Sequence, residues 1–263
     1  MDQQNLYHGL TQDEALTKVR DEIDHIDQEI HALLNKRAEC AQRVADIKNN
    51  FGANSPVFYR PEREAQVLRK AMDRNQGPLP DQEIARLFRE VMSVCLAHEH
   101  RMNVGFVKTS ELNTEQAALK QFGHSVEPIA FSSAADTLSS LANGALHYAV
   151  LSVNTLPEVL SLLVSHQLNI VGEVCLHGDE SFLVVGLQTV SASGDDKTAL
   201  IVESTDLVIA DASRVIADAS RVISDGTQTY IELEGAVSVD QVQSMVGAEL
   251  NFYYLGLFPK AVF

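Results

Sequence analysis

Three basic side chains stand in or beside an apolar helical seam near the start of the chain. Apolar residues recur every three or four positions between residues 23 and 47, and Arg37 falls within that series. Arg20 and Lys48 lie next to its two ends. Cations in a buried stripe are costly unless an anion meets them. We therefore expect an anionic group, from the chain or from a ligand, to face these positions.

Two carboxyl groups occupy comparable positions on the segments that follow. Glu64 shares a helical face with Leu68, and Glu99 follows Cys95 on the apolar face of a later helix. The residue types alone allow two interpretations. Either the charges form a binding site for a small anion, or they are buried structural ion pairs together with arginines that extend outward to water.

The three basic residues lie in a segment that is predicted to form one long helix. No Gly or Pro interrupts residues 13–50, which predicts a single helix about 57 Å long at 1.5 Å per residue. One small domain cannot cover that length, so we expect a partner chain to lie along it.

Two shorter helices complete an all-helical unit. Pro61 predicts the first turn of a helix that ends near Asn75, and Asp81 is expected to cap another helix that ends near His100. Residues 1–103 are thus predicted to form one all-α domain of three helices. The expected core stripe of the third helix comprises Ile84, Leu87, Phe88, Val91 and Cys95.

After residue 103 the pattern changes to strands that alternate with helices, which predicts an α/β lobe over 104–190. The polar stretch 191–196 is expected to be a linker, and a small α+β domain is expected over 195–263. The predicted strands cover 103–107, 147–153, 170–175, 182–186, 198–203, 229–233 and 252–255, and the predicted helices cover 115–122, 156–165 and 239–247.

A tandem repeat interrupts the last domain. Residues 208–214 and 215–221 both read Val-Ile-Ala-Asp-Ala-Ser-Arg, and residues 222–225 begin a third copy. We predict that the repeat passes from helix into strand. We interpret it as a slippage duplication without a binding role.

The composition argues against several classes of function. Residues 1–103 hold 14 Lys and Arg against 17 Asp and Glu, and residues 104–263 hold 6 against 19, so neither part offers a net basic face to nucleic acid. No apolar run approaches the roughly 20 residues of a membrane helix, and no signal peptide is visible. Cys40, Cys95 and Cys175 fit neither a disulfide framework nor a zinc site. We expect a cytoplasmic protein that uses no metal or cofactor.

Residues 13–103 contain a set of motifs, namely Val19-Arg20-x-x-Ile23-x-x-Ile26-Asp27, Leu33-Leu34-Asn35-Lys36-Arg37, Ile47-Lys48, Tyr59-Arg60-Pro61-Glu62-Arg63-Glu64 and Leu87-Phe88-Arg89-Glu90-x-Met92-Ser93-x-Cys95-Leu96. These motifs resemble those of the all-helical chorismate mutases, above all the mutase half of the bifunctional chorismate mutase–prephenate dehydratases. That resemblance implies chorismate as the substrate and an intertwined homodimer whose active sites combine side chains of both chains.

The resemblance assigns roles to four charged residues. Arg37 and Arg20 of the partner subunit would hold the two carboxylates of chorismate, and Lys48 and Glu99 would flank its ether oxygen. The rearrangement to prephenate is pericyclic, so catalysis needs only a compact substrate conformer and stabilised charge on that oxygen. Arginines bind carboxylates in bidentate fashion, and Lys48 supplies a point charge. Glu99 donates a hydrogen bond only when protonated, so we expect burial and the substrate's charge to raise its pKa.

Three further residues receive substrate-binding positions from the resemblance. Glu64 would bind the ring hydroxyl of chorismate, and Arg63 and Cys95 fall at or next to positions that contact the substrate. Arg60 stands where some relatives carry an Asp that faces the hydroxyl, so the resemblance assigns it no role.

The rest of the chain looks, more weakly, like the other parts of these bifunctional enzymes. Residues 104–124 and 170–174 resemble the first lobe of a prephenate dehydratase, and residues 195–198 and 255–262 resemble the two ends of an ACT regulatory domain. The family's catalytic Thr-Arg-Phe is replaced by Glu180-Ser181-Phe182, and the stretch 177–182 stands where a second lobe is expected. We therefore predict a mutase domain followed by a truncated dehydratase-like lobe and a degenerate ACT-like domain, without dehydratase activity.

Two rival functions stay open on the sequence. One is a catalytically inactive paralogue that regulates or binds a partner, although every cation that the rearrangement needs is present. The other is a lyase on the same helical fold that removes pyruvate from isochorismate, since those relatives share the arginines and the lysine.

Overall fold

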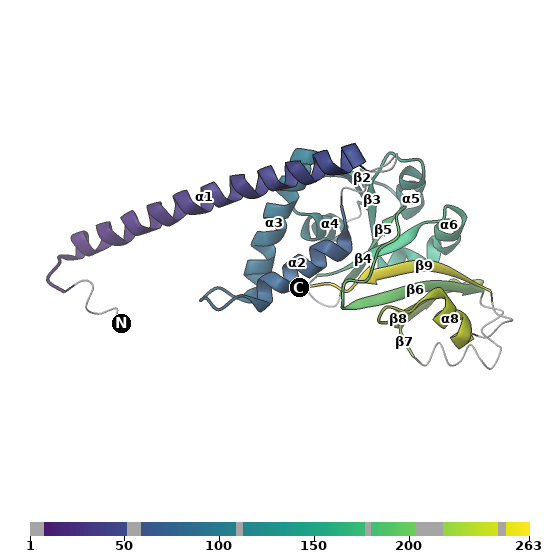
Figure 1. Ribbon diagram of the computed structural model, residues 1–263. Helices are drawn as coiled ribbons and strands as arrows, with labels where there is room; N and C mark the ends of the chain where they lie inside the picture. The colour runs from purple at the N-terminus through teal and green to yellow at the C-terminus, as the bar shows by residue number, and fades with distance from the viewer. Residues whose placement is uncertain (1–7, 52–58, 109–112, 177–179, 204–217, 247–250) are drawn as a thin grey trace. The chain divides into compact units, whose positions relative to one another are not determined.

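The computed structural model describes residues 8–51, 59–108, 113–176, 180–203, 218–246 and 251–263 (Figure 1). Contacts divide the chain into two units, residues 1–56 and residues 57–263.

The first unit is the single helix α1, Gln12–Phe51, which confirms the long helix predicted over 13–50. Its start is fixed by a reciprocal cap. The backbone N–H of Thr11 donates to Glu14 Oε2 at 2.8 Å, and the backbone N–H of Glu14 donates to Thr11 Oγ1 at 3.4 Å.

The second unit opens with α2, Pro61–Asp73, and α3, Asp81–Glu99. Pro61 occupies the first turn of α2 as predicted, but Asp81 is the first helical residue of α3 and Pro80 is its N-cap. The predicted core stripe of α3 is only partly right. Cys95 is buried, whereas Leu87 is 52% exposed, because the helix turns a neighbouring face inward. That face carries Ala85, Arg89, Ser93 and Cys95.

A five-stranded sheet follows, in the order β2-β1-β3-β5-β4. β1 pairs in parallel with β2 and β3, and β5 pairs antiparallel with β3 and β4. The strands are β1 Asn103–Val107, β2 Glu127–Phe131, β3 Tyr148–Ser152, β4 Asn169–Cys175 and β5 Ser181–Gly186.

Helices cover both faces of this sheet, and alternate side chains of β3 show how. Tyr148 and Val150 pack with residues of α4, while Ala149 and Leu151 pack with residues of α5 and α6. The helices are α4 Thr114–Phe122, α5 Ala134–Ala142 and α6 Leu160–Ser165, with a 3₁₀ helix, η2, at Val153–Glu158. The α/β lobe predicted from the alternating pattern is therefore present.

A second, four-stranded antiparallel sheet has the order β7-β8-β6-β9. Leu200 and Ile231 on one face pack against Val242 of α8, whereas Ile201 and Tyr230 on the other join the core of the α/β lobe. The two sheets thus share one continuous core. The elements are β6 Asp196–Glu203, β7 Ala219–Ser224, β8 Gln228–Glu234, α8 Val239–Val246 and β9 Phe252–Pro259 (Figure 1).

The stretch predicted as a linker, residues 191–196, connects β5 to β6 but is anchored rather than free. Ser193 and Asp196 are buried, and the Ser193 hydroxyl donates to Asp196 Oδ1 at 2.6 Å. Arg69 of α2 donates to Ser193 Oγ at 3.0 Å and to the Asp195 carbonyl at 2.9 Å. This turn therefore ties α2 to the second sheet.

The repeat lies largely outside the described residues, which exclude 204–217. The end of its second copy forms the start of β7, in agreement with the strand that we predicted there. The helical part of that prediction falls on residues outside the described range.

Candidate active site

The long helix presents two of the predicted catalytic cations on one side. Arg37 and Lys48 are eleven residues apart, which is about three turns, so they project in the same direction about 16 Å apart. Both are half-buried, whereas Arg20 is exposed. Helix α1 thus presents these two cations on one side, about three turns apart.

The apolar seam of α1 is largely open. Because the same helix carries the cations, whatever covers the seam also approaches Arg37 and Lys48. The exposed fractions include 50% for Ile23, 48% for Ile30, 63% for Leu33 and 58% for Ile47.

The remaining predicted residues lie on α2 and α3 of the second unit. Glu99 is the last residue of α3 and is half-buried, while Cys95, one turn earlier, is buried. Arg63 is exposed in the first turn of α2, and Arg60 is the exposed N-cap of that helix. Within the second unit, Cys95 and Glu99 lie near the C-terminal end of α3. Within the first unit, Arg37 and Lys48 lie on one side of α1.

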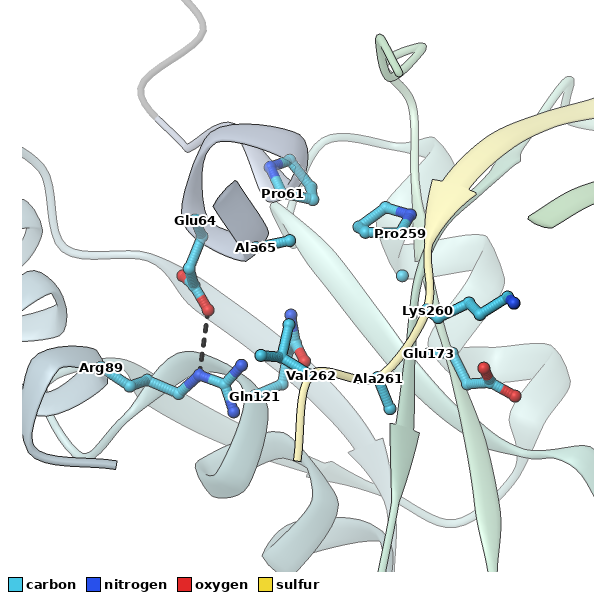
Figure 2. A pocket seen from close by; sticks show the side chains of 11 residues that line it. Pro61, Glu64, Ala65, Arg89, Gln121, Glu173, Pro259, Lys260, Ala261 and Val262 are labelled. Carbon is cyan, nitrogen blue, oxygen red and sulfur yellow. Dashed lines mark hydrogen bonds and ion pairs between the residues drawn. The ribbon is translucent and has the colours of Figure 1, made fainter. Parts of the chain in front are cut away.

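Glu64 is engaged in an ion pair that the sequence did not predict. Its Oε1 accepts a hydrogen bond from Arg89 Nε at 3.0 Å, and the two side chains are 11% and 7% exposed (Figure 2). Burial raises the pKa of Glu64, and the neighbouring Arg89 opposes that shift. Arg89 also donates to the Lys120 carbonyl at 2.8 Å, so a single guanidinium joins α2, α3 and α4.

The cavity beside this ion pair is small. Its volume is about 10 Å³, which is room for roughly one water molecule. Figure 2 shows Glu64 and Arg89 on one side of it and Lys260 and Glu173 on the other. No substrate of the size of chorismate fits there.

Arg89 could have been found from its spacing. Ala85, Arg89 and Ser93 recur every four residues, and the two small residues are typical of a closely packed helix face. The charged member of such a series must meet a carboxylate, and Glu64 is a nearby candidate on the preceding helix.

A hydrogen-bonded aromatic cluster fixes the start of α2 to the first sheet. The Tyr59 ring lies 5.1 Å from that of Phe122 and 5.2 Å from that of Tyr148. Gln121 Nε2 donates to the Tyr59 hydroxyl at 3.0 Å, and burial raises the pKa of Tyr59 well above its ordinary value. The segment Tyr59-Arg60-Pro61 at the start of α2 thus serves packing as well as helix initiation.

A second set of buried charges lies between the two sheets. Lys197 Nζ is 2.8 Å from Glu173 Oε1 and 3.2 Å from Glu232 Oε2, and Arg221 contacts the same two carboxylates. Two cations face two anions, so the group is internally compensated. Two of the six Lys and Arg residues after residue 103 thus help to hold the sheets together.

The positions that resemble dehydratase motifs are used for packing and for a turn. Phe182 is 2% exposed in the core of the first sheet, and Asn113 Nδ2 donates to Glu180 Oε2 at 2.9 Å. The Leu176 backbone N–H donates to the Glu180 carbonyl at 2.9 Å, and Cys175 pairs with Ser181 across β4 and β5. These contacts join β4 directly to β5.

Among the described residues, no group of three or more His, Cys, Asp and Glu is arranged to hold a metal ion. A search of the same residues found no helix with the length and apolar character needed to cross a bilayer.

Two family models match the chain, one after the other. The chorismate mutase type II model matches residues 19–100, and the prephenate dehydratase model matches residues 109–218. A solved prephenate dehydratase from Streptococcus mutans is 14% identical with a TM-score of 0.47, over 61% of this chain and 99% of that one.

The chain is also similar to bifunctional enzymes. The bifunctional chorismate mutase/prephenate dehydratase of Pseudomonas aeruginosa is 38% identical over 178 residues, which cover 65% of this chain and 49% of the relative. That of Neisseria gonorrhoeae is 42% identical over 171 residues, or 63% and 46%. The chain spans about half the length of these relatives. The two family matches and these relatives support the assignment of this chain to the bifunctional chorismate mutase–prephenate dehydratase family, with a dehydratase part truncated relative to these homologues.

Proposed function

We propose that this chain is a chorismate mutase, an isomerase that rearranges chorismate to prephenate in aromatic amino acid biosynthesis. One observation carries the proposal. The segment that matches the chorismate mutase family, residues 19–100, contains all four charged residues that the rearrangement needs. These are Arg20, Arg37, Lys48 and Glu99.

The proposed mechanism uses binding and charge alone. Arg37, with Arg20 of the partner subunit, holds the two carboxylates and so selects the compact conformer in which the reacting carbons meet. Lys48 and a protonated Glu99 donate to the ether oxygen, where negative charge grows as the C–O bond breaks. The placement of Arg37 and Lys48 on one side of α1 suits this division of roles.

The open apolar seam of α1 supports a homodimer. A 40-residue helix that exposes Ile30, Leu33 and Ile47 needs a cover, and a second copy of α1 offers an equally long apolar partner. Such a dimer would bring Arg20 of one chain toward the cations of the other.

For Glu64 we favour a structural role over the expected contact with the ring hydroxyl. Its carboxylate is buried and paired with Arg89, beside a cavity too small for a substrate. It therefore positions α2 against α3. Arg63 and Cys95 stay proposed as residues near the substrate.

We further propose that the chain does not dehydrate prephenate. The short connection between β4 and β5 occupies the place of the second lobe that a dehydratase cleft requires, and Lys197 and Arg221 are bound to buried carboxylates. The resemblance of residues 195–263 to an ACT domain is likewise a proposal, supported by the four antiparallel strands and helix α8 in the described part of this region.

The decisive assay mixes purified full-length protein with chorismate and identifies the products. Loss of chorismate with accumulation of prephenate supports the mutase, whereas release of pyruvate in a parallel reaction with isochorismate supports the rival lyase. Arg37→Ala should abolish the turnover, and Lys36→Ala, an exposed neighbour on the same helix, should not. Untouched chorismate with the wild-type protein would support an inactive paralogue.

A further inference from the structure

A larger cavity lies between α3 and α4, away from the residues assigned to chorismate. Its volume is about 400 Å³, within the range of pockets that hold small ligands. Basic side chains line one part of it, namely Arg86, Arg89, Lys120 and His124. The exposed Arg86 and His124 side chains form its outer rim.

Glu83 and Glu90 also line this cavity, and most of its basic side chains contact a carboxylate. Arg86 pairs with Glu83, His124 pairs with Glu90, and Arg89 pairs with Glu64. Lys120 is the exception: it is half-buried, its Nζ donates to the Cys175 carbonyl at 2.8 Å, and it makes no ion pair with any described carboxylate. Burial and the adjacent Arg89 lower the pKa of Lys120. An anion beside Lys120 would stabilise the charged form of this lysine and so raise its pKa again.

The wall next to these cations is apolar and aromatic. The Phe263 ring lies 4.5 Å from the guanidinium carbon of Arg89 and 5.3 Å from Lys120 Nζ. Leu119 and Leu176 extend the same wall. A ligand that fits both parts has a compact apolar body and a single negative group.

We propose that this cavity binds a small carboxylate with an aromatic or alicyclic body, whose carboxylate pairs with Lys120 and whose ring packs against Phe263 and Leu176. Arg86 at the rim attracts the anion. Because these residues lie outside the proposed catalytic set, the site stands independently of the mutase proposal.

Isothermal titration calorimetry of the full-length protein tests this, with 3-phenylpropionate as the probe and its neutral amide as the matched ligand. We expect saturable binding of one carboxylate per chain, and about tenfold weaker binding of the amide, because the hydrogen bond to a charged group is lost. Lys120→Met should weaken carboxylate binding about tenfold, and Arg86→Gln less. Lys70→Met, an exposed lysine on α2, should leave it unchanged.

Arg37→Ala distinguishes binding in this cavity from binding at the proposed catalytic site. It removes a carboxylate-binding residue from the catalytic site, so it should not alter the titration. Binding that disappears in Arg37→Ala would overturn the proposal by placing the probe at α1. Absence of saturable binding, or equal affinity for the amide in the wild-type protein, would also overturn it. The amide comparison needs no variant, so it stands even if Lys120→Met does not fold.

Discussion

Helix α1 and the unit formed by residues 57–263 place their cations in different surroundings. On α1 the half-buried Arg37 and Lys48 lie on a helix whose apolar side chains are largely exposed, with Leu33 63% exposed. In the second unit, the buried Arg89 and the half-buried Lys197 and Arg221 each contact a buried or nearly buried carboxylate of the same unit.

The difference lies in what surrounds the cations. A buried charge with a carboxylate partner stabilises one arrangement of helices or sheets, and losing the partner is costly. Cations on a helix whose apolar side chains are exposed are suited to a site that a second chain completes. The following predictions test that contrast.

Arg89→Ala should have the largest effect on stability. It leaves Glu64 buried without its cation, so we expect the free energy of unfolding to fall by about 3–5 kcal/mol. Chemical denaturation of the full-length protein measures this. Arg63→Ala, an exposed arginine on α2, is the control, and we expect it to change stability by less than about 0.5 kcal/mol. Equal effects would show that the buried pair is not what joins the helices.

Lys48→Ala should act on the reaction rather than on the fold. Losing the cation at the ether oxygen should lower kcat/KM for chorismate by about 10²–10³-fold, with little change in unfolding. Steady-state kinetics and denaturation on the same preparation test both parts. A variant with full activity would remove Lys48 from the proposed mechanism.

Leu33→Asp should weaken assembly, because it puts a charge into the open seam of α1. We expect the dimer dissociation constant to rise at least about tenfold, which is 1.4 kcal/mol or more. Sedimentation equilibrium measures it. Leu79→Asp carries the same change at an exposed leucine of the second unit and should leave association unaffected.

Glu99→Gln should flatten the pH profile of the reaction. Glu99 is the proposed catalytic group outside α1, and it donates to the substrate only when protonated. The wild-type rate should therefore fall about tenfold per pH unit once Glu99 ionises, whereas the amide donates at every pH. Matching profiles for the two proteins would rule out this role.

His147→Asn should have the smallest effect, on the pH dependence of stability. Burial and the nearby His100 lower the pKa of His147, whose Nε2 lies 2.9 Å from that of His100. Above the ordinary value near 6.5 both folded and unfolded states are neutral. As pH falls through that value the unfolded state binds the proton first, so stability decreases. Denaturation between about pH 7 and 5 should show a shallower decrease in the variant.

Much of the fold can be predicted from residue spacing, and the elements that were not predicted have identifiable causes. The uninterrupted helix of α1 and the buried strands β3 and β5 are strongly periodic. Edge strand β2 contains Pro128 and is only partly buried, and α5 is rich in Ser and Ala, so neither gave a clear pattern. Both were missed.

The residues of the candidate site also fall into those that spacing predicts and those that it does not. Arg37 and Lys48 were recognisable because they interrupt or flank an apolar series on one helix. The four-residue spacing of Ala85, Arg89 and Ser93 indicates that Arg89 faces inward, but its pairing with Glu64, 25 residues earlier, is fixed only when α2 packs against α3. Contacts between elements depend on packing that local spacing does not encode.

Subunit complementation tests the central claim most directly. Arg20→Ala and Arg37→Ala should each be nearly inactive in chorismate rearrangement. If each site takes Arg20 from one chain and Arg37 from the other, random mixing makes half of the dimers mixed, each with one intact site. The mixture should then recover about a quarter of wild-type activity. A mixture no more active than the two variants alone would contradict the shared site.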